Sequence, residues 1–512
     1  MCWPWTASPV AAPRRSAVAW SMPVAARPTS SAPGYPDNSE AMFNYLRQEV
    51  GEAVSADTLR DFCQRSVEQL AWLERHGVAF EASVPPQKTS YPSDRYYLYY
   101  SGNEAVPAYA AQATPAPRGH RAKGPGMSGA SLFAPLRASA LKLGVRLRSQ
   151  CEVRQLVVDN HDRVLGVVAW QLPADSRAAR RHARLARWVS VLQMYVPALA
   201  EVLRKRLRQI EQRHAVRTLI RAEKGLLLSC GGFIFNRELV ARHAPQYLAG
   251  LPLGSSACDG SGLLLGQSAG ASLARMDKIS AWRFINPPLA WARGMIVNGL
   301  GLRYCNEEVY GATLGHAMVE EQRGKAILIL NRALVRQALK QVGPGKVWNF
   351  QRLPVLLNLL FNAKRGNSLE QLAERCALPA GNLRQSVAQY SSAARGTSPT
   401  RWASRRRCSA RWTAAPGMPS TCPMTAACSP ARPLTLGGLR VDERSGAVLD
   451  LHGAPIAGLY SAGRNAVGVA SNLYVSGLSL ADCIYSGRRA AAHIAAHAAR
   501  NPAPSGEQPC NV

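Results

Sequence analysis

The chain has 512 residues, 47% of them hydrophobic, which is enough for two or three packed domains with a substantial core. Its 62 Lys and Arg against 32 Asp and Glu give a formal net charge of +30, but no basic motif interleaved with aromatic residues points to a nucleic-acid-binding protein. The 12 cysteines lack paired spacing, so neither a disulfide framework nor a metal site is predicted, and this includes Cys408, Cys422 and Cys428.

The beginning of the chain has no element that we can predict. Residues 1–36 are rich in Ala, Pro and Ser, show no periodicity and are expected to be irregular. They contain no buried strand followed by G-x-G-x-x-G, because Gly34 is the only glycine before Gly51. No apolar run in the chain reaches the ~20 residues of a membrane-spanning helix, and no export signal is evident. We therefore expect a cytoplasmic protein.

Regular structure is predicted to begin with a helix over Glu40–Val50, capped by Ser39. A second helix is predicted over Ala56–His76, ended by Gly77. The aromatic run Tyr91–Tyr100 (YPSDRYYLYY) is a loop or a strand. Two interpretations of it stay open, aromatic packing at the surface or the lining of a site for a flat apolar substrate.

A basic, glycine-rich loop, Arg118–Gly129, precedes a predicted helix over Ala130–Leu143. Such a loop at a helix N-terminus can bind phosphate. Strands are predicted over Val145–Val153, Gln155–Val158 and Val164–Trp170.

Leu185–His214 has apolar residues at spacings of three and four among many arginines, and it is predicted to be one basic amphipathic helix. We favour a helix that covers the core, since packing requires the same apolar stripe. The alternative is a helix that lies on an anionic membrane surface.

Lys224–Phe233 is predicted to be a buried strand ending in two glycines, and Asn236 to cap the helix that follows. Asp259–Ala271 has the pattern of a loop leading into a helix. Ala326–Leu330 is predicted to be a strand, and Leu369–Ala394 to contain two helices.

Residues 396–432 interrupt this order, because they are rich in Arg, Ser, Pro, Ala and Cys, contain no acidic residue and show no periodicity. Two hypotheses are open for this segment and for residues 1–36. Both are disordered, or both are GC-rich coding sequence read out of frame. The coding DNA decides between them, since the second hypothesis requires an alternative frame that restores G-x-G-x-x-G or a folded linker.

The stretch Pro455–Arg489 is where the clearest functional pattern lies. It is predicted to form a strand over Ile456–Tyr460, a turn of small residues, a polar loop, and a helix over Leu478–Ala490. This order lets the backbone approach a bulky anionic or planar ligand closely.

The run N-L-Y-V-S-G-L-S-L-A-D at 472–482 resembles the flavin-contacting motif of the fumarate reductase/succinate dehydrogenase flavoprotein superfamily. Within it, the run is most similar to FAD-dependent 3-ketosteroid dehydrogenases of the 3-oxo-5α-steroid 4-dehydrogenase branch. KGLLLSCGGF at Lys224–Phe233 and VNGLGLRYCNEEVY at Val297–Tyr310 match further stretches of the family, and the resemblance covers Asn38–Ile494 with gaps.

The resemblance implies an α/β fold, in which a discontinuous Rossmann-like FAD-binding domain, incomplete at the N-terminus, carries an inserted α+β substrate or capping domain. The implied FAD-binding parts are residues 37–270, with a helical insertion at 178–215, and residues 433–495. The implied capping domain is residues 271–395, and residues 496–512 are a tail.

The site residues are implied by the same resemblance. Tyr474 would be the catalytic base, with Tyr310 and Ser476 as its hydrogen-bonding partners, and backbone N–H near Gly477 would stabilise the substrate's carbonyl oxygen. The implied FAD-binding positions are Gly124, Ser128, Gly129, Val153, Ser229, Gly231, Gly232, Gly463, Arg464, Ser479 and Leu480.

The implied function is FAD-dependent desaturation of a 3-ketosteroid next to its carbonyl, with an unidentified electron acceptor and no nucleic-acid partner. One alternative is a fumarate reductase-like flavoprotein that acts on small dicarboxylates. Another is a homologue that cannot bind FAD, given the missing first motif. A peripheral membrane contact through residues 185–214 also stays open.

Overall fold

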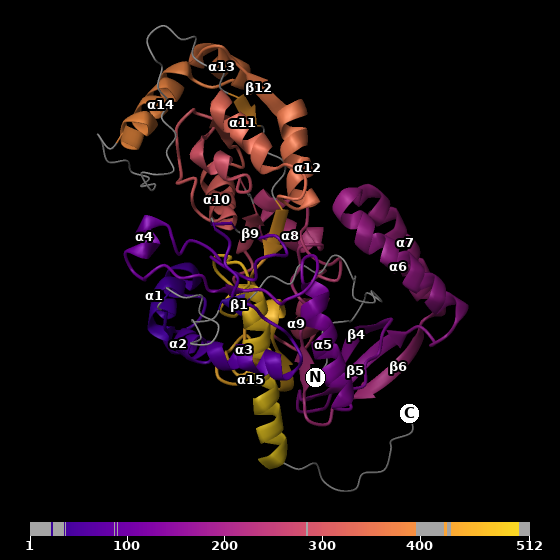
Figure 1. Ribbon diagram of the computed structural model, residues 1–512. Coiled ribbons are helices and arrows are strands. Elements are labelled where there is room, and N and C mark those ends of the chain that lie inside the picture. Colours follow the sequence, from indigo (N-terminus) through magenta and orange to yellow (C-terminus); the bar gives the residue numbers. More distant parts are fainter. Residues whose placement is uncertain are drawn as a thin grey trace.

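The computed structural model describes residues 22–23, 35, 37–86, 88–89, 91–282, 285–395, 424–426 and 432–500 (Figure 1). The helices are α1 (Ser39–Val50), α2 (Ala56–Gln64), α3 (Ser66–Arg75), α4 (Pro107–Ala110), α5 (Gly129–Lys142), α6 (Arg177–Tyr195), α7 (Pro197–His214), α8 (Arg237–His243), α9 (Ser261–Ser268), α10 (Gly311–His316), α11 (Arg332–Gln341), α12 (Asn349–Leu357), α13 (Leu369–Cys376), α14 (Ala380–Arg395) and α15 (Leu478–Arg500). The strands are β1 (Met22–Pro23), β2 (Leu98–Tyr99), β3 (Gly119–His120), β4 (Cys151–Val158), β5 (Val164–Gln171), β6 (Val216–Arg221), β7 (Leu226–Leu228), β8 (Leu273–Ala274), β9 (Ile279–Trp282), β10 (Met295–Val297), β11 (Ile327–Leu330), β12 (Ala363–Arg365), β13 (Met424–Ala426), β14 (Arg432–Thr435), β15 (Gly438–Leu439), β16 (Ala447–Leu449) and β17 (Pro455–Ser461).

The predicted α/β fold is confirmed, and it is built from distant parts of the chain. β17 pairs in parallel with β7, with Leu459 opposite Leu226, and β16 lies antiparallel on the other side of β17. A continuous apolar core packs β7, α9 and β17 together, and it includes the fully buried Leu263 and Leu459. The segment at 226–228 and the C-terminal segment at 455–461 therefore belong to one folded unit.

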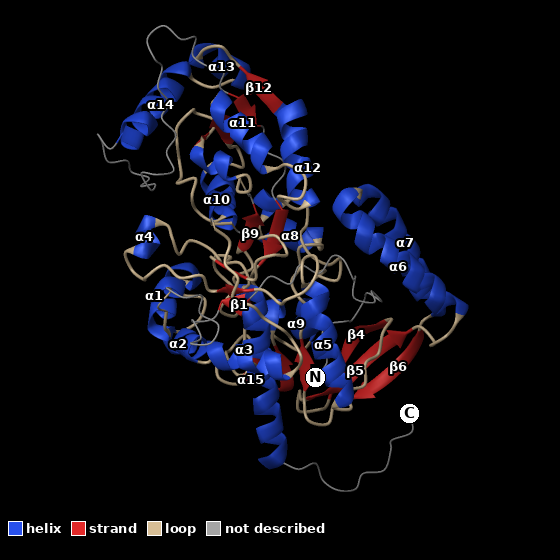
Figure 2. Cartoon of the chain, in the orientation of Figure 1, coloured by secondary structure: helices blue, strands red, loops and turns tan. Residues whose placement is uncertain are grey.

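A second group of elements forms a separate lobe. Figure 1 shows α10 to α14 gathered at the top, with α1 to α3 and α15 in the lower part and β9 between them. In the upper lobe, helices cover a sheet of order β10-β11-β13-β12 (Figure 2). Most of this α+β lobe comes from the predicted capping segment, residues 271–395, but its strand β13 comes from the later segment that was predicted to be irregular, and the domain bounds stay a prediction.

Several predicted element ends differ from the structure because a local contact outweighs periodicity. Asn38, rather than Ser39, caps α1, since its side chain accepts the Ala41 N–H at 2.8 Å. The helix predicted over Ala56–His76 is two helices that meet at Arg65. The strand predicted from Val145 begins at Cys151 and runs without interruption to Val158, with an irregularity in pairing after Val153.

The single basic helix predicted over Leu185–His214 is wrong. The segment forms a hairpin, α6 and α7, whose two helices pack through Ala186, Val189 and Leu207. Pro197 begins α7, where its missing N–H costs no helical hydrogen bond. Figure 1 shows the hairpin projecting beside the sheet of β4, β5 and β6. Among the described residues, no helix is both long enough and apolar enough to cross a membrane.

The two segments predicted to be irregular lie mostly outside the described residues, as do Cys408, Cys422 and Cys428, but each contributes one short strand. Met22–Pro23 pairs with Gly119–His120 as β1, and Met424–Ala426 lies between β11 and β12 as β13. Strands of two or three residues are specified by the strands that they pair with rather than by their own sequence pattern. At the other end of the chain, α15 continues to Arg500 and so includes the first residues of the predicted tail.

Candidate active site

Aromatic side chains from four separate segments gather at the boundary of the two lobes. Tyr91, Tyr99, Tyr310 and Tyr474 are all buried, and Trp282 packs against both Tyr474 and Tyr91 with ring centroids 4.9 Å and 6.1 Å away. We call these five residues the aromatic cluster. Its walls present phenol hydroxyls and ring faces, a combination that suits a flat apolar ligand with a polar end.

The two loops that carry the predicted catalytic residues each donate a backbone N–H to one neighbouring loop, Ser101–Asn103. The Ser476 N–H donates to the Ser101 carbonyl at 3.0 Å, and the Tyr310 N–H donates to the Asn103 side-chain oxygen at 2.7 Å. The Ser476 hydroxyl and the Tyr99 hydroxyl are 2.7 Å apart. The structure thus brings together Tyr310, Tyr474 and Ser476, the three side chains that the resemblance implied.

Gly477 forms the turn into α15 with a φ of 82°, in the left-handed region that glycine adopts without strain. The Ser476 N–H already donates to the Ser101 carbonyl, so the Gly477 N–H is the backbone donor of this turn that could bind a ligand. Within the part of the chain that the structure describes, the Gly477 N–H meets no acceptor. It can therefore donate to a ligand oxygen, the role predicted for this position.

Burial governs the acidity of the two central phenols. It raises the pKa of Tyr474, while the charge of Arg464 lowers it. Burial also raises the pKa of Tyr310, and so does Tyr474, whereas hydrogen bonds with Tyr91 and Ser476 lower it. Arg464 is therefore the cation that favours an ionised Tyr474.

Arg464 also marks the candidate cofactor site. Its Nη2 donates to Cys258 Sγ at 3.2 Å, and its buried Nη1 has no hydrogen-bond partner among the described residues. A buried guanidinium nitrogen without an acceptor is costly unless a ligand supplies one. The carbonyl and phosphate oxygens of FAD are acceptors of this kind, so Arg464 fits the cofactor.

Glycines around Arg464 keep side chains out of this space. Gly231 has a φ of 83°, and a Cβ there would lie 3.1 Å from Cys258 Sγ and 3.9 Å from Arg464 Nη2. Gly463 has a φ of 62°, and a Cβ there would lie 2.8 Å from Cys483 Sγ. Gly231 and Arg464 therefore form a cradle that a bulky ligand can approach closely, whereas Gly463 makes room for Cys483 of α15.

The other predicted cofactor positions are distributed around this core. Gly124, Ser128 and Gly129 lie at the start of α5, where the neighbouring Met127 packs against Tyr91 and Tyr99. Ser128 has left-handed backbone, and its hydroxyl accepts from Arg121 Nε at 2.8 Å, which leaves its backbone rather than its hydroxyl for a ligand.

The remaining predicted positions lie at three further places. Ser229 and Gly232 follow β7, and a Cβ at Gly232 would meet Thr435 Oγ1 rather than the cradle. Ser479 and Leu480 lie in the first turn of α15. Val153 lies in β4, packed against the core that contains Ala466, and the structure does not bring it to the aromatic cluster.

Three contributing residues were not among the predicted site residues. Tyr91 and Tyr99 belong to the aromatic run for which two interpretations stayed open, and their burial beside Tyr310 favours the substrate-lining one. Trp282 had no signal in the sequence, because it is a single aromatic at the end of β9. Tyr304, the other aromatic of the stretch that ends at Tyr310, packs in the core of the upper lobe instead.

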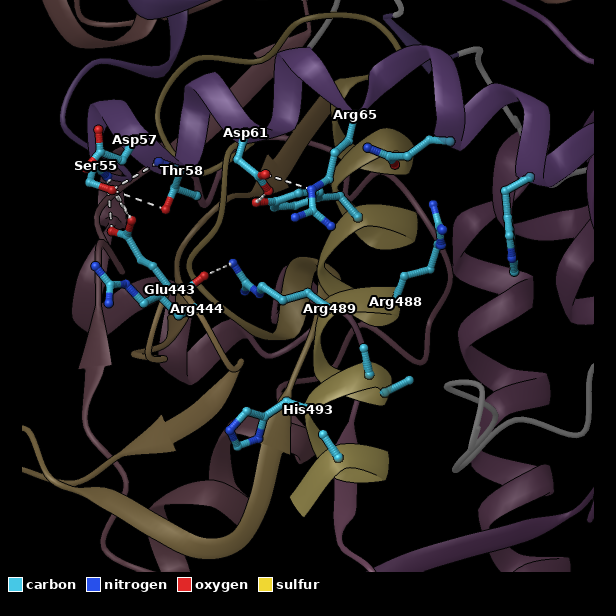
Figure 3. Close-up of a pocket in the computed structure, with 16 residues that line it drawn as sticks. Ser55, Asp57, Thr58, Asp61, Arg65, Glu443, Arg444, Arg488, Arg489 and His493 are labelled. Carbon is cyan, nitrogen blue, oxygen red and sulfur yellow. Dashed lines mark hydrogen bonds and ion pairs between the residues drawn. The ribbon is translucent and has the colours of Figure 1, made fainter. Parts of the chain in front are cut away.

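A large cavity lies away from this site. It has a volume of about 940 Å³ and lies between α2, α3 and α15. Figure 3 shows its charged side chains bonded to neighbouring groups, with Arg65 Nε 2.7 Å from Asp61 Oδ1 and Arg489 Nη1 2.6 Å from the Glu443 backbone carbonyl oxygen. None of the predicted site residues lines it, so we place the chemistry at the aromatic cluster.

Comparison with known proteins agrees with this geometry. The sequence matches the FAD binding domain family over residues 11–480, a range that extends into the segment predicted to be irregular. It is 39% identical over 433 residues to the 3-oxo-5-alpha-steroid 4-dehydrogenase of Comamonas testosteroni, covering 83% of this chain and 81% of that protein. It is 23% identical over 389 residues to a probable fumarate reductase, Ifc3, of Shewanella frigidimarina, covering 74% of this chain and 55% of that protein.

Among solved structures, the fold is similar to a 3-ketosteroid-Δ4-(5α)-dehydrogenase from Rhodococcus jostii RHA1, determined in complex with 4-androstene-3,17-dione. The TM-score is 0.76 at 28% sequence identity, and the match covers 94% of this chain and 89% of that one.

Proposed function

This chain belongs to the FAD binding domain family, and from that premise we propose that its aromatic cluster desaturates a 3-ketosteroid next to the carbonyl group. The protein is an FAD-dependent oxidoreductase of the 3-oxosteroid dehydrogenase type. The observation that carries the residue assignment is the convergence of Tyr474, Tyr310 and Ser476 beside the Arg464 cradle.

Desaturation removes a proton from one carbon and a hydride from its neighbour, and a carbon–carbon double bond forms between them. Bound FAD supplies the two-electron acceptor for the hydride. The proton requires a base, and Tyr474 is the phenol that Arg464 makes more acidic. Tyr310 and Ser476 would hold or relay the proton, since both hydrogen-bond within the cluster.

The ketone oxygen gains negative charge as the proton leaves the adjacent carbon. A hydrogen-bond donor fixed beside that oxygen stabilises the charge without reorganisation. The N–H of Gly477, in the left-handed turn before α15, would take this role. The ring faces of Trp282 and Tyr91 would pack on the apolar steroid rings and orient the substrate.

The fumarate reductase alternative has less support. Small dicarboxylates require several cationic groups at the substrate site, whereas the groups that approach Tyr474 are mostly aromatic, with Arg464 as the cation. Turnover assays with an artificial electron acceptor separate the two functions. We expect reduction of the acceptor with a saturated 3-ketosteroid and none with succinate, and the reverse result would establish the alternative.

Replacing Ser476 with alanine should reduce turnover only in part. The substitution removes the hydroxyl that pairs with Tyr99 at 2.7 Å but leaves Tyr474 and the backbone N–H to Ser101. Loss of one buried hydrogen bond of about 1–2 kcal/mol corresponds to roughly a tenfold fall in kcat. Steady-state kinetics check this, with Ser268→Ala as a control that removes a hydroxyl bonded only to the Leu265 carbonyl.

We also propose that the α6–α7 hairpin contacts an anionic membrane surface. Around its turn, Trp188, Val191, Val196, Leu199 and Val202 each expose between 46% and 57% of their surface. The exposed cations nearby are Arg184, Arg187, Lys205, Arg206 and Arg208. Both glutamates of the hairpin are paired, Glu201 with Arg204 at 2.8 Å and Glu211 with His182 at 2.6 Å. An apolar tip within a positively charged surface fits anionic lipid.

Vesicle flotation tests this contact. The double variant Trp188→Ser and Leu199→Ser should bind vesicles that contain phosphatidylserine at least about tenfold more weakly than wild type. It removes apolar side-chain area that would be buried in the lipid. The matched control is Leu264→Ser with Leu451→Ser, two residues exposed by 50% and 78% outside the hairpin. The proposal would be contradicted if both variants bound these vesicles equally weakly. It would also be contradicted if the wild-type protein bound vesicles of phosphatidylcholine alone as tightly as vesicles that contain phosphatidylserine.

A further inference from the structure

Two buried carboxyl groups lie next to the loops that carry Tyr310 and Ser476, and the proposed reaction assigns no step to either of them. Glu49 lies in the last turn of α1 and Glu104 in the loop after β2, with 0% and 1% of their surfaces exposed. Both acids belong to the group of residues that fixes the loops of Tyr310 and Ser476. Two buried carboxylates at one place repel each other, so their hydrogen-bond donors decide which of them is ionised.

The donors are divided unequally between the two acids. Glu104 accepts the N–H of Ser101 at 2.8 Å, the Ser101 hydroxyl and the N–H of Gly102 at 2.7 Å, so both of its carboxyl oxygens have donors. Glu49 accepts one strong bond, from Asn103 Nδ2 to Oε1 at 2.7 Å, and its Oε2 is buried without a hydrogen-bond partner among the described residues. An ionised oxygen at that point would be unsolvated.

Asn103 connects Glu49 to the catalytic loops. Its Nδ2 donates to Glu49 and also to Thr313 Oγ1 at 2.9 Å in α10, and its Oδ1 accepts the Tyr310 N–H at 2.7 Å. The Glu49 backbone carbonyl accepts the Leu473 N–H at 3.1 Å, next to Tyr474. The Glu49–Asn103 pair therefore bridges the Tyr310 loop and the Tyr474 loop.

We propose that Glu49 is protonated in the folded enzyme and that this neutral carboxyl, acting through Asn103, holds Tyr310 in place beside Tyr474. Glu49 and Asn103 are then positioning residues. Their effect on turnover rests on the proposed function, whereas the protonation of Glu49 does not. Ionisation of Glu49 would put a second buried negative charge beside Glu104 and pull the Asn103 amide toward it. The Tyr310 and Tyr474 loops would then lose their common support.

The charged and titratable groups that face Glu49 agree with this state. Burial raises the pKa of Glu49 to about 7, its bond from Asn103 lowers it, and Glu104 raises it further, with smaller lowering contributions from Tyr109 and from Lys88. The Tyr45 hydroxyl accepts the Asn103 N–H at 3.0 Å and belongs to the same cluster. The folded pKa is raised, so this group's contribution to stability falls as pH rises from its ordinary pKa of 4.5 through about 7.

The variant Glu49→Gln tests the proposal, since a glutamine copies a protonated glutamate and cannot ionise. Wild-type kcat should decline on the alkaline side, to about a tenth of its plateau one pH unit above the Glu49 midpoint. The Glu49→Gln enzyme should keep its plateau over that range, whereas a declining limb identical to that of wild type would overturn the proposal. Asn103→Ala should lower kcat at every pH with little change in KM.

An infrared readout separates this proposal from the proposed function, because it needs no steroid. The wild-type spectrum should contain one protonated carboxyl band that is missing from Glu49→Gln and that disappears with a midpoint near neutral pH. The buried carboxyl of Asp482, whose pKa burial raises to about 6, should contribute equally to both spectra. If the band behaves so but neither protein oxidises any 3-ketosteroid, the protonation of Glu49 stands and the proposed function is wrong. If the wild-type and Glu49→Gln spectra contain the same carboxyl bands, the proposal is overturned, whatever the activity.

Discussion

Replacing Tyr474 with phenylalanine should reduce kcat by about a hundredfold to ten-thousandfold, the range that a positioned acid–base group contributes. The phenol oxygen is the group that takes the proton, and Arg464 is the cation that lowers its pKa against the effect of burial. The ring remains in the variant, so its packing against Trp282 at 4.9 Å should persist. Steady-state kinetics with a saturated 3-ketosteroid measure the loss, and the visible spectrum shows whether flavin binding is unchanged.

The control for this prediction is Tyr460→Phe. Tyr460 is also buried, and its hydroxyl lies 3.2 Å from His493 Nδ1 on α15, away from the aromatic cluster. The variant removes the same atom from a buried tyrosine outside the cluster, so it should retain near-normal turnover. If Tyr474→Phe retained turnover comparable to Tyr460→Phe, the assignment of the base would be wrong.

Replacing Gly231 with alanine should weaken FAD binding by at least about tenfold, equivalent to ~1.4 kcal/mol or more. The new Cβ would lie 3.1 Å from Cys258 Sγ and 3.9 Å from Arg464 Nη2, inside the cradle that we assign to the cofactor. Alanine at a φ of 83° is also strained, which by itself costs about 1–2 kcal/mol of stability. Flavin content per purified chain and FAD titration of the flavin-depleted protein measure the effect.

Gly270→Ala provides a matched control, because Gly270 has nearly the same φ, 82°, and a Cβ there would meet no atom within 4 Å. Both variants should lose similar thermal stability, but only Gly231→Ala should lose flavin affinity. Equal flavin affinity in the two variants would show that the cofactor does not occupy the cradle beside Arg464.

The part of the site that could be predicted from sequence is the part that is local. Tyr474, Ser476 and Gly477 lie within four residues of one another, so a motif fixes their relative placement once the turn and α15 form. Tyr310 could be named only through its resemblance to a family pattern. What brings it to Tyr474 is the Asn103 side chain, from a loop more than two hundred residues earlier, and periodicity carries no information on such contacts.

The same limit applies to Trp282, Glu49 and the element ends. Trp282 reaches the aromatic cluster because β9 pairs with β14, and the sequences of these two strands do not indicate that they pair. Glu49 continues the polar pattern of a surface helix, yet it is fully buried against Asn103. The break between α6 and α7 was missed because the apolar spacing continues in phase across Pro197, so the pattern fits one helix as well as two.

The predicted fold class follows from longer signals, namely several buried strands between helices and a strand–turn–helix at the end of the chain. The connection that makes the domain discontinuous is the parallel pairing of β7 with β17, and only the family resemblance anticipated it. The strand β13, by contrast, comes from a segment with no acidic residue and no periodicity, and nothing in its three residues indicates an inner strand.

The most direct test of the account is a spectrum of the purified chain, taken without oxygen before and after addition of a saturated 3-ketosteroid. We predict a yellow protein whose flavin absorbance is bleached by the steroid and is unaffected by succinate. A colourless protein that takes up no FAD, or a yellow protein that succinate bleaches and the steroid does not, would contradict it.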